Sequence, residues 1–186
     1  MLILKLLVFA IPVTLAAILH MIAVKINLFP FLKIPLDFGK SFHGKRIFGD
    51  HKTLRGVILM ILFSIIGVYF LQFLHLKFES IRNLNILNFD QYSPVFYGVL
   101  FGLAYTLAEL PNSFMKRQLN IQEGKQGNFI NVLLDQFDSP FGCLIAMYPF
   151  SLMSWQFFVF GSFFFLFLHM FFNFTLYLLK LRKNPL

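Results

Sequence analysis

The sequence is poor in charged residues. Only 13% of its 186 residues are Asp, Glu, Lys or Arg, whereas a soluble globular domain carries about 25%. So few charges cannot cover the surface of a compact soluble domain, which excludes a soluble enzyme. A hydrophobic content of 58% excludes a disordered chain. The single cysteine, Cys143, excludes an internal disulfide framework.

Long hydrophobic runs stand where those charges are missing. A helix needs about 20 apolar residues to cross a bilayer core of roughly 30 Å. Candidate spans lie at residues 2–24, 54–74, 94–110, 140–153 and 157–179. The first run could instead be a signal peptide, because Lys5 precedes it, but further spans follow. We therefore predict an all-α polytopic membrane protein of about five transmembrane helices, with residues 1–186 forming a single integral membrane domain.

The basic residues are distributed unevenly between the expected loops. Of the 16 Lys and Arg residues, 13 lie in or beside segments 25–53 and 111–139 or in the C-terminal tail. Loops rich in Lys and Arg stay in the cytoplasm. We therefore expect the protein in the cytoplasmic membrane, with two long cytoplasmic loops that form the site. The N-terminus would then lie outside and the C-terminus inside.

The first of these loops combines basic residues with glycines. Residues 40–55 contain five Lys or Arg and one acid, Asp50, and glycines punctuate the same stretch. Glycine lets backbone amides approach an anion, and Lys and Arg neutralise phosphate charge. Thr53 stands where a helix would begin, and a helix N-terminus favours anions. The alternative is a solvated basic loop that only obeys the charge rule.

The second loop carries acids. Asp135 and Asp138 are three residues apart, so a helix would place them on one face, where they could share a divalent cation such as Mg²⁺. Alternatively, residues 138–140 are a helix start with Asp138 as its cap. Glu109 lies at the end of an expected span, where an acid has a function or a partner. Its alternative is an ion pair with a nearby basic residue of the same segment, Lys116 or Arg117.

Other kinds of site lack their motifs. The sequence has no Walker or Gly-x-Ser-x-Gly motif, and His43 and His51 lack zinc spacing. Basic glycine-containing loops, acids and a membrane frame suit the handling of a polyphosphate with Mg²⁺. The alternatives are a non-catalytic protein that binds anionic lipids and a small transporter. The first leaves the acids unexplained, and the second requires charges at the midplane of the spans.

Three segments in this order resemble the CDP-archaeol synthase family, which is related to the phosphatidate cytidylyltransferases that make CDP-diacylglycerol. They are residues 44–56 (GKRIFGDHKTLRG), 113–117 (SFMKR) and 134–138 (LDQFD). The resemblance implies an enzyme that joins CTP to a membrane lipid phosphate in phospholipid biosynthesis. The product would be a CDP-archaeol-like or CDP-diacylglycerol-like lipid, with pyrophosphate released. The expected partners are CTP, the lipid phosphate and the bilayer, with Mg²⁺ as cofactor and without nucleic acid.

The resemblance also assigns roles to residues. It implies that the CTP phosphates are bound by Lys45, Arg46, Lys52, Thr53, Arg55, Ser113, Lys116 and Arg117. The metal candidates are Asp135, Asp138 and Glu109, with Asp50 as a weaker one. Within these sets, Lys52, Lys116 and Asp138 are expected to act in catalysis.

The sequence departs from the family pattern at two points. Gln118 follows Lys116 and Arg117 where the family often has another basic residue, and residues 118–128 lack an aspartate that the phosphatidate enzymes carry. The acceptor lipid therefore cannot be copied from either branch. Oligomeric state is not encoded in any of these features.

Overall fold

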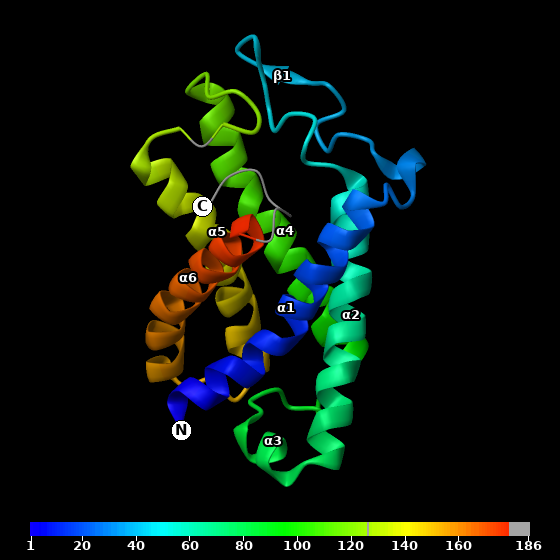
Figure 1. The fold of residues 1–186 in the computed structure, drawn as a ribbon, viewed down its shortest axis with the longest axis vertical. Coiled ribbons are helices and arrows are strands. Elements are labelled where there is room, and N and C mark those ends of the chain that lie inside the picture. The colour runs from blue at the N-terminus through cyan, green and yellow to red at the C-terminus, as the bar shows by residue number, and fades with distance from the viewer. Residues whose placement is uncertain (126, 179–186) are drawn as a thin grey trace.

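The computed structural model describes residues 1–125 and 127–178. Its helices are α1 (Leu2–Lys25), α2 (Leu54–Lys77), α3 (Glu79–Leu84), α4 (Pro94–Gln118), α5 (Phe129–Met147) and α6 (Trp155–Leu178). Two short 3₁₀ turns, η1 (Pro30–Leu32) and η2 (Tyr148–Phe150), and the strands β1 (Ser41–Phe42) and β2 (Lys45–Arg46) complete the described part. The long helices lie side by side, as predicted for an all-helical membrane protein (Figure 1).

The apolar helices match most of the expected spans. Within the described residues, α1, α2, α4 and α6 are each long and apolar enough to cross a membrane, and α5 is not in this group. The predicted span at 140–153 instead corresponds to the second half of α5 and the η2 turn that follows it. Asn131, Asp135, Gln136 and Asp138 interrupt the apolar residues in the first half of α5, so its mean hydropathy falls although the helix is continuous.

The segment 111–139 is not the loop that we predicted. Helix α4 continues through Pro111 to Gln118, and α5 already begins at Phe129. A proline inside a helix removes one backbone hydrogen bond but does not have to end the helix. Asn112 and Lys116, which follow Pro111, form hydrogen bonds with Asp135 of α5. Hydropathy therefore fell there without a change in secondary structure.

Side-chain caps explain where α2 and α5 begin. Thr53 accepts a hydrogen bond from the Gly56 amide and caps α2, as its place in the sequence predicts. Asn128 accepts from the Asn131 amide and caps α5. The interpretation of residues 138–140 as a helix start is therefore wrong, because Asp138 lies in the middle of α5.

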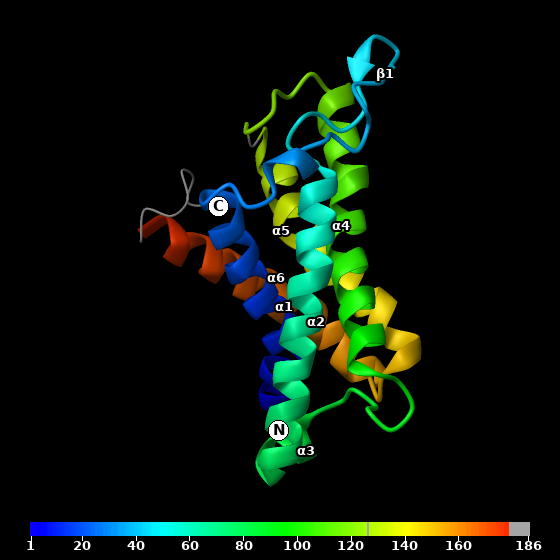
Figure 2. The ribbon, with the colours of Figure 1, turned by 90° about the vertical axis from the view of Figure 1, so that its right-hand side faces the viewer.

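Glycines allow α2 and α4 to approach closely. A Cβ atom on Gly98 or Gly102 would overlap the backbone of Ile65 or Ile61 in α2, so the helices touch along this seam. Figure 2 shows the two helices running side by side. On α6, by contrast, Phe160, Phe163 and Phe167 are more than half exposed, as expected for side chains that face lipid.

The two predicted loops meet at one end of the molecule. The hairpin of β1 and β2 and the α4–α5 loop lie together at the top of Figure 1, while α3 and the N-terminus lie at the opposite end. Lys45 of β2 donates to the Gln118 carbonyl at the end of α4, at 2.5 Å. The fold therefore brings both polar segments to the same end of the helices.

Candidate active site

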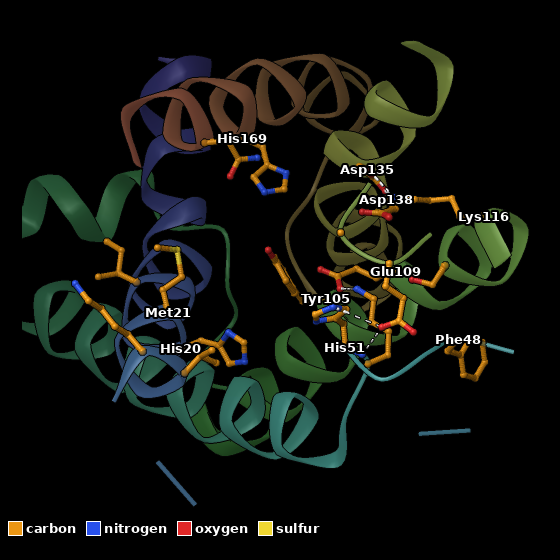
Figure 3. A pocket seen from close by; sticks show the side chains of 18 of the residues that line it. His20, Met21, Phe48, His51, Tyr105, Glu109, Lys116, Asp135, Asp138 and His169 are labelled. Atoms are coloured by element: carbon orange, nitrogen blue, oxygen red, sulfur yellow. Dashed lines mark hydrogen bonds and ion pairs between the residues drawn. The ribbon is translucent and has the colours of Figure 1, made fainter. Parts of the chain in front are cut away.

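A cavity of about 870 Å³ lies below the two loops. It is lined by α1, residues 48–52 of the first loop, α4, the α4–α5 loop, α5 and α6. Figure 3 shows Glu109, Lys116, Asp135 and Asp138 gathered on one side of this cavity. His20 and Met21 of α1 lie across from them in the same view. The cavity thus has a charged side and a side formed largely by α1.

The structure brings together a part of the predicted site. The predicted residues that line the cavity are Lys52, Glu109, Ser113, Lys116, Arg117, Asp135 and Asp138. They come from the first loop, from successive turns at the end of α4 and from the adjacent turn of α5. Asp135 and Asp138 lie on one face of α5, as their spacing predicts for a helix.

Asn112 joins the two aspartates of α5. Its Nδ2 atom donates to Oδ1 of Asp135 at 2.7 Å and to Oδ2 of Asp138 at 3.1 Å. Ser139 then links Asp138 to the third acid, because its hydroxyl donates to Oε1 of Glu109 at 2.9 Å. Three carboxylates on two helices thus belong to one hydrogen-bonded network.

Each of two acids also has a lysine partner. Lys116 contacts Oδ2 of Asp135 at 2.7 Å, and Lys52 of the first loop contacts Oε2 of Glu109. Glu109 is therefore paired, but not with Lys116 or Arg117 as our alternative interpretation had it. The Lys52 contact ties the first loop to α4 across the cavity.

The arrangement fits a hard divalent cation whose ligands are completed by a substrate. Among residues 1–125 and 127–178, no group of three or more acids, histidines or cysteines is arranged to hold a metal ion alone. Mg²⁺ usually takes one or two carboxylates and shares substrate phosphates. Asp135 and Asp138 supply such a pair. The Oδ1 atom of Asn112 is buried beside them and has no hydrogen-bond partner among the described residues.

The remaining predicted residues lie outside the cavity lining. Arg55 is buried and donates to the side chain of Asn27 at 2.8 Å, so it fixes the chain after α1. Arg46 forms ion pairs with Asp37 and Asp50, at 2.7 and 2.8 Å. Lys45 donates a hydrogen bond to the end of α4. Thr53 caps the start of α2. These residues shape the loop around the site.

Asp37, which sequence reasoning did not single out, organises the first loop. Its carboxylate accepts from the Arg46 side chain and from the amides of Gly39, Phe48 and Gly49. Burial by itself raises the pKa of Asp37, but these hydrogen bonds outweigh it and hold the pKa well below its usual value. The only sequence signal was an acid two residues before a glycine in a basic loop.

Glu123 of the α4–α5 loop was also missed. Its carboxylate accepts from the backbone amides of Asp50 and His51, at 3.0 and 3.2 Å. The contact holds the two loops together over the cavity. Nothing in the spacing of these residues, which are more than 70 positions apart, indicated it.

A second cavity, of about 370 Å³, adjoins the first and is largely apolar. It is bounded by α1, α2, α4, α5 and α6, with Phe9, Ala17 and Phe172 among its lining residues. His20, Tyr105 and His169 line both cavities, so the two are neighbours. Charged and apolar binding spaces therefore lie next to each other between the helices.

Comparisons with known proteins agree with one family. The model of the CarS-like CDP-archaeol synthase family matches residues 1–186. The chain is 31% identical over 161 residues to a CDP-archaeol synthase of Saccharolobus islandicus, covering 84% of this chain and 85% of the relative. It is 35% identical over 136 residues to one of Picrophilus torridus, covering 70% and 62%.

A solved structure has the same fold. It is described as an intramembrane enzyme for archaeal membrane lipids biosynthesis, and the match covers 89% of this chain and 90% of that one. The TM-score is 0.59 at 21% sequence identity. Together with the match of the family model along the whole sequence, these relatives show that the chain belongs to the CDP-archaeol synthase family of membrane cytidylyltransferases.

Proposed function

We propose that this chain transfers the cytidylyl group of CTP to the phosphate of a glycerol ether lipid in the membrane, with Mg²⁺ as cofactor and pyrophosphate as second product. One observation carries the proposal: the charged cavity adjoins an apolar one between the same helices. A lipid phosphate needs both environments at once. The names of the relatives from Saccharolobus and Picrophilus support the ether lipid and the CDP product.

The reaction needs positioning and charge neutralisation more than a protein nucleophile. An oxygen of the lipid phosphate attacks the α-phosphorus of CTP, and the bond from this phosphorus to the bridging oxygen of the β-phosphate breaks. The pyrophosphate leaves with the electron pair of that bond. Mg²⁺ would be held by Asp135 and Asp138, with Glu109 beside them, and would neutralise charge on the phosphates.

Basic residues of the first loop and of the end of α4 bind the phosphates in this proposal. Lys52 and Lys116 exchange their carboxylate partners for phosphate oxygens when the nucleotide enters. Ser113 and Arg117, on the same end of α4, line the cavity and complete the set. The exchange keeps each lysine paired, and the carboxylates that the lysines leave would be paired by Mg²⁺.

The lipid tails occupy the apolar cavity, and the headgroup phosphate reaches the charged cavity past Tyr105. The loops face the cytoplasm, where CTP is available, with the N-terminus on the outer side. The excess of Lys and Arg in the loop segments supports this orientation. A passive binder of anionic lipids would not require the acids that α4 and α5 hold beside these cations.

A transfer assay tests the reaction. Purified protein in lipid nanodiscs receives Mg²⁺ and CTP labelled at the α- or the γ-phosphate, with an unsaturated archaetidic acid or phosphatidic acid as acceptor. We expect α-label in the lipid phase, γ-label only in pyrophosphate, a preference for the ether lipid and complete loss with chelator. Label from the γ-position in lipid, or none from either in folded protein, would contradict the proposal.

A matched pair of variants tests the assigned acids. Asp138→Asn should lower turnover by about 100-fold or more while thermal unfolding is kept, because it removes charge where the cation binds. Asp90→Asn makes the same change at an exposed position at the α3 end of the molecule and should leave turnover unchanged. Full activity of Asp138→Asn would overturn the metal assignment.

A further inference from the structure

Four successive backbone N–H groups of the first loop, those of residues 48–51, donate to two carboxylates. The first two donate to Asp37, each at 2.9 Å. The last two donate to Glu123, at 3.0 and 3.2 Å. This stretch of backbone therefore presents a row of donors that binds negatively charged oxygens.

The two carboxylates differ in what holds them. The Asp37 side chain is fully buried, belongs to the same loop and is fixed by Arg46 as well. The Glu123 side chain comes from the other loop and is 26% exposed. Its additional partner, His51 at 3.5 Å, is itself mostly exposed. Asp37 is thus a permanent part of the loop, whereas the Glu123 contact can open without unfolding it.

The donors that Glu123 occupies have the geometry of an anion site. Gly49 has φ +94°, and a Cβ atom there would overlap Oε1 of Glu123, so only glycine leaves room for the bound oxygen. Successive amides at such a turn form a concave nest that accepts carboxylate or phosphate oxygens alike. Phe48, His51 and Glu123 all line the charged cavity, so this nest borders the space that Lys116 and Arg117 also line.

We propose that the amides of Asp50 and His51 form a phosphate subsite, and that Glu123 fills it as an internal stand-in until a phosphate group of the nucleotide displaces it. This inference rests on the proposed function and names where one phosphate of CTP or pyrophosphate binds. Displacement exchanges one anion for another at the same donors. It also removes the contact by which Glu123 joins the α4–α5 loop to the first loop.

Competition between Glu123 and phosphate predicts the direction in which removal of Glu123 changes the affinity for phosphate. A subsite that is open in only a fraction of molecules binds with an apparent affinity lowered by that fraction. Removing the stand-in should therefore strengthen binding, by about 5–10-fold if Glu123 occupies the subsite most of the time. If Glu123 is only a clasp, a contact that holds the two loops together, its removal should weaken phosphate binding, because the loops that bind phosphate would become disordered.

The test measures binding of magnesium pyrophosphate by calorimetry, with purified full-length protein in nanodiscs. Pyrophosphate lacks the base, so it reports on phosphate sites alone. We expect Glu123→Gln to bind it more tightly than wild type and Glu123→Ala to bind it at least as tightly as Glu123→Gln. Gly49→Ala should bind it more weakly, because the added Cβ fills the nest. Glu79→Gln, the same change on an exposed residue of α3, should not alter binding.

The outcomes separate this inference from the proposed function. Weaker or unchanged binding by both Glu123 variants, with wild-type binding intact, makes Glu123 a clasp and overturns the subsite. Binding of neither pyrophosphate nor CTP by folded wild-type protein overturns the proposed function, and the subsite with it. Thermal unfolding of each variant, measured alongside, shows that its fold is retained.

Discussion

The side-chain nitrogen of Asn112 lies 2.7 Å from Oδ1 of Asp135, and the same atom reaches Asp138 at 3.1 Å. One amide on α4 thus holds two carboxylates of α5 together. Like charges this close repel each other, so a donor between them keeps both near the cavity. In the function proposed above, Asn112 would orient the carboxylates that hold the cation.

Replacing Asn112 tests this role. Asn112→Leu keeps the size of the side chain and removes its donor, so the two aspartates lose their common orientation. We expect the Mg²⁺ concentration for half-maximal activity to rise by about 10–100-fold. The Mg²⁺ dependence of CDP-lipid formation measures it. Asn83→Leu, on an exposed face of α3, is the control, and an equal response of both variants would argue against the role.

Asp37 should contribute to stability without touching substrate. Asp37→Asn removes the ion pair with Arg46 and weakens the hydrogen bonds from the loop amides. Because charged partners strengthen hydrogen bonds, we expect the free energy of unfolding to fall by about 2–3 kcal/mol. Thermal unfolding in detergent measures this loss. An unchanged unfolding temperature would mean that the loop is ordered by other contacts.

The low pKa of Asp37 predicts how this contribution depends on pH. A carboxyl whose folded pKa lies below its unfolded value of about 3.9 stabilises the fold fully above that value. The contribution is lost as the pH falls toward the folded pKa. The difference in unfolding temperature between wild type and Asp37→Asn should therefore be constant from about pH 7 to 5 and shrink below about pH 4. A difference that grows below pH 4 would have the wrong sign.

Gly102 should be intolerant of any side chain. Its missing Cβ is where the backbone of Ile61 in α2 passes, so Gly102→Ala has to push the helices apart. We expect a loss of about 1–3 kcal/mol, measured as a lower unfolding temperature. Gly161→Ala is the matched control, because its new Cβ would lie 3.1 Å from the end of the Leu6 side chain and would not overlap any backbone atom. An equal fall in unfolding temperature for both variants would contradict a close contact between Gly102 and α2.

Filling the apolar cavity should weaken binding of the lipid and leave binding of the phosphate groups of the nucleotide unchanged. Ala17 lines only the apolar cavity, so Ala17→Phe narrows the space for lipid tails and leaves the phosphate sites intact. We expect the KM for the lipid to rise by about 10-fold and pyrophosphate binding to stay unchanged. Steady-state kinetics with the lipid varied measure the first effect and calorimetry the second. Leu7→Phe, on the exposed side of α1, is the control.

Much of the helical frame was predictable from the sequence. Residues 2–24 and 54–74 match α1 and α2 closely, because long apolar runs leave few alternatives to a helix. The spacing of Gly98 and Gly102 permits a close helix contact without naming a partner, and the structure places both glycines against α2. The segment 111–139 was mistaken for a loop because hydropathy falls where a helix turns a polar face toward a neighbour. Hydropathy reports what surrounds a helix, so it cannot mark the helix end.

The sequence by itself determined that this is a helical membrane protein, which residues are basic or acidic, and that Asp135 and Asp138 would share a face if their segment were helical. Only the tertiary structure decided the partners: Lys52 with Glu109, Asn112 with both aspartates, and Glu123 with the amides of the first loop. It also placed Arg46 and Arg55 in structural contacts outside the cavity lining. The reason is physical, because residue type and local spacing fix what a side chain can bind. What it does bind depends on which distant segments the packing of the helices brings within a few ångströms.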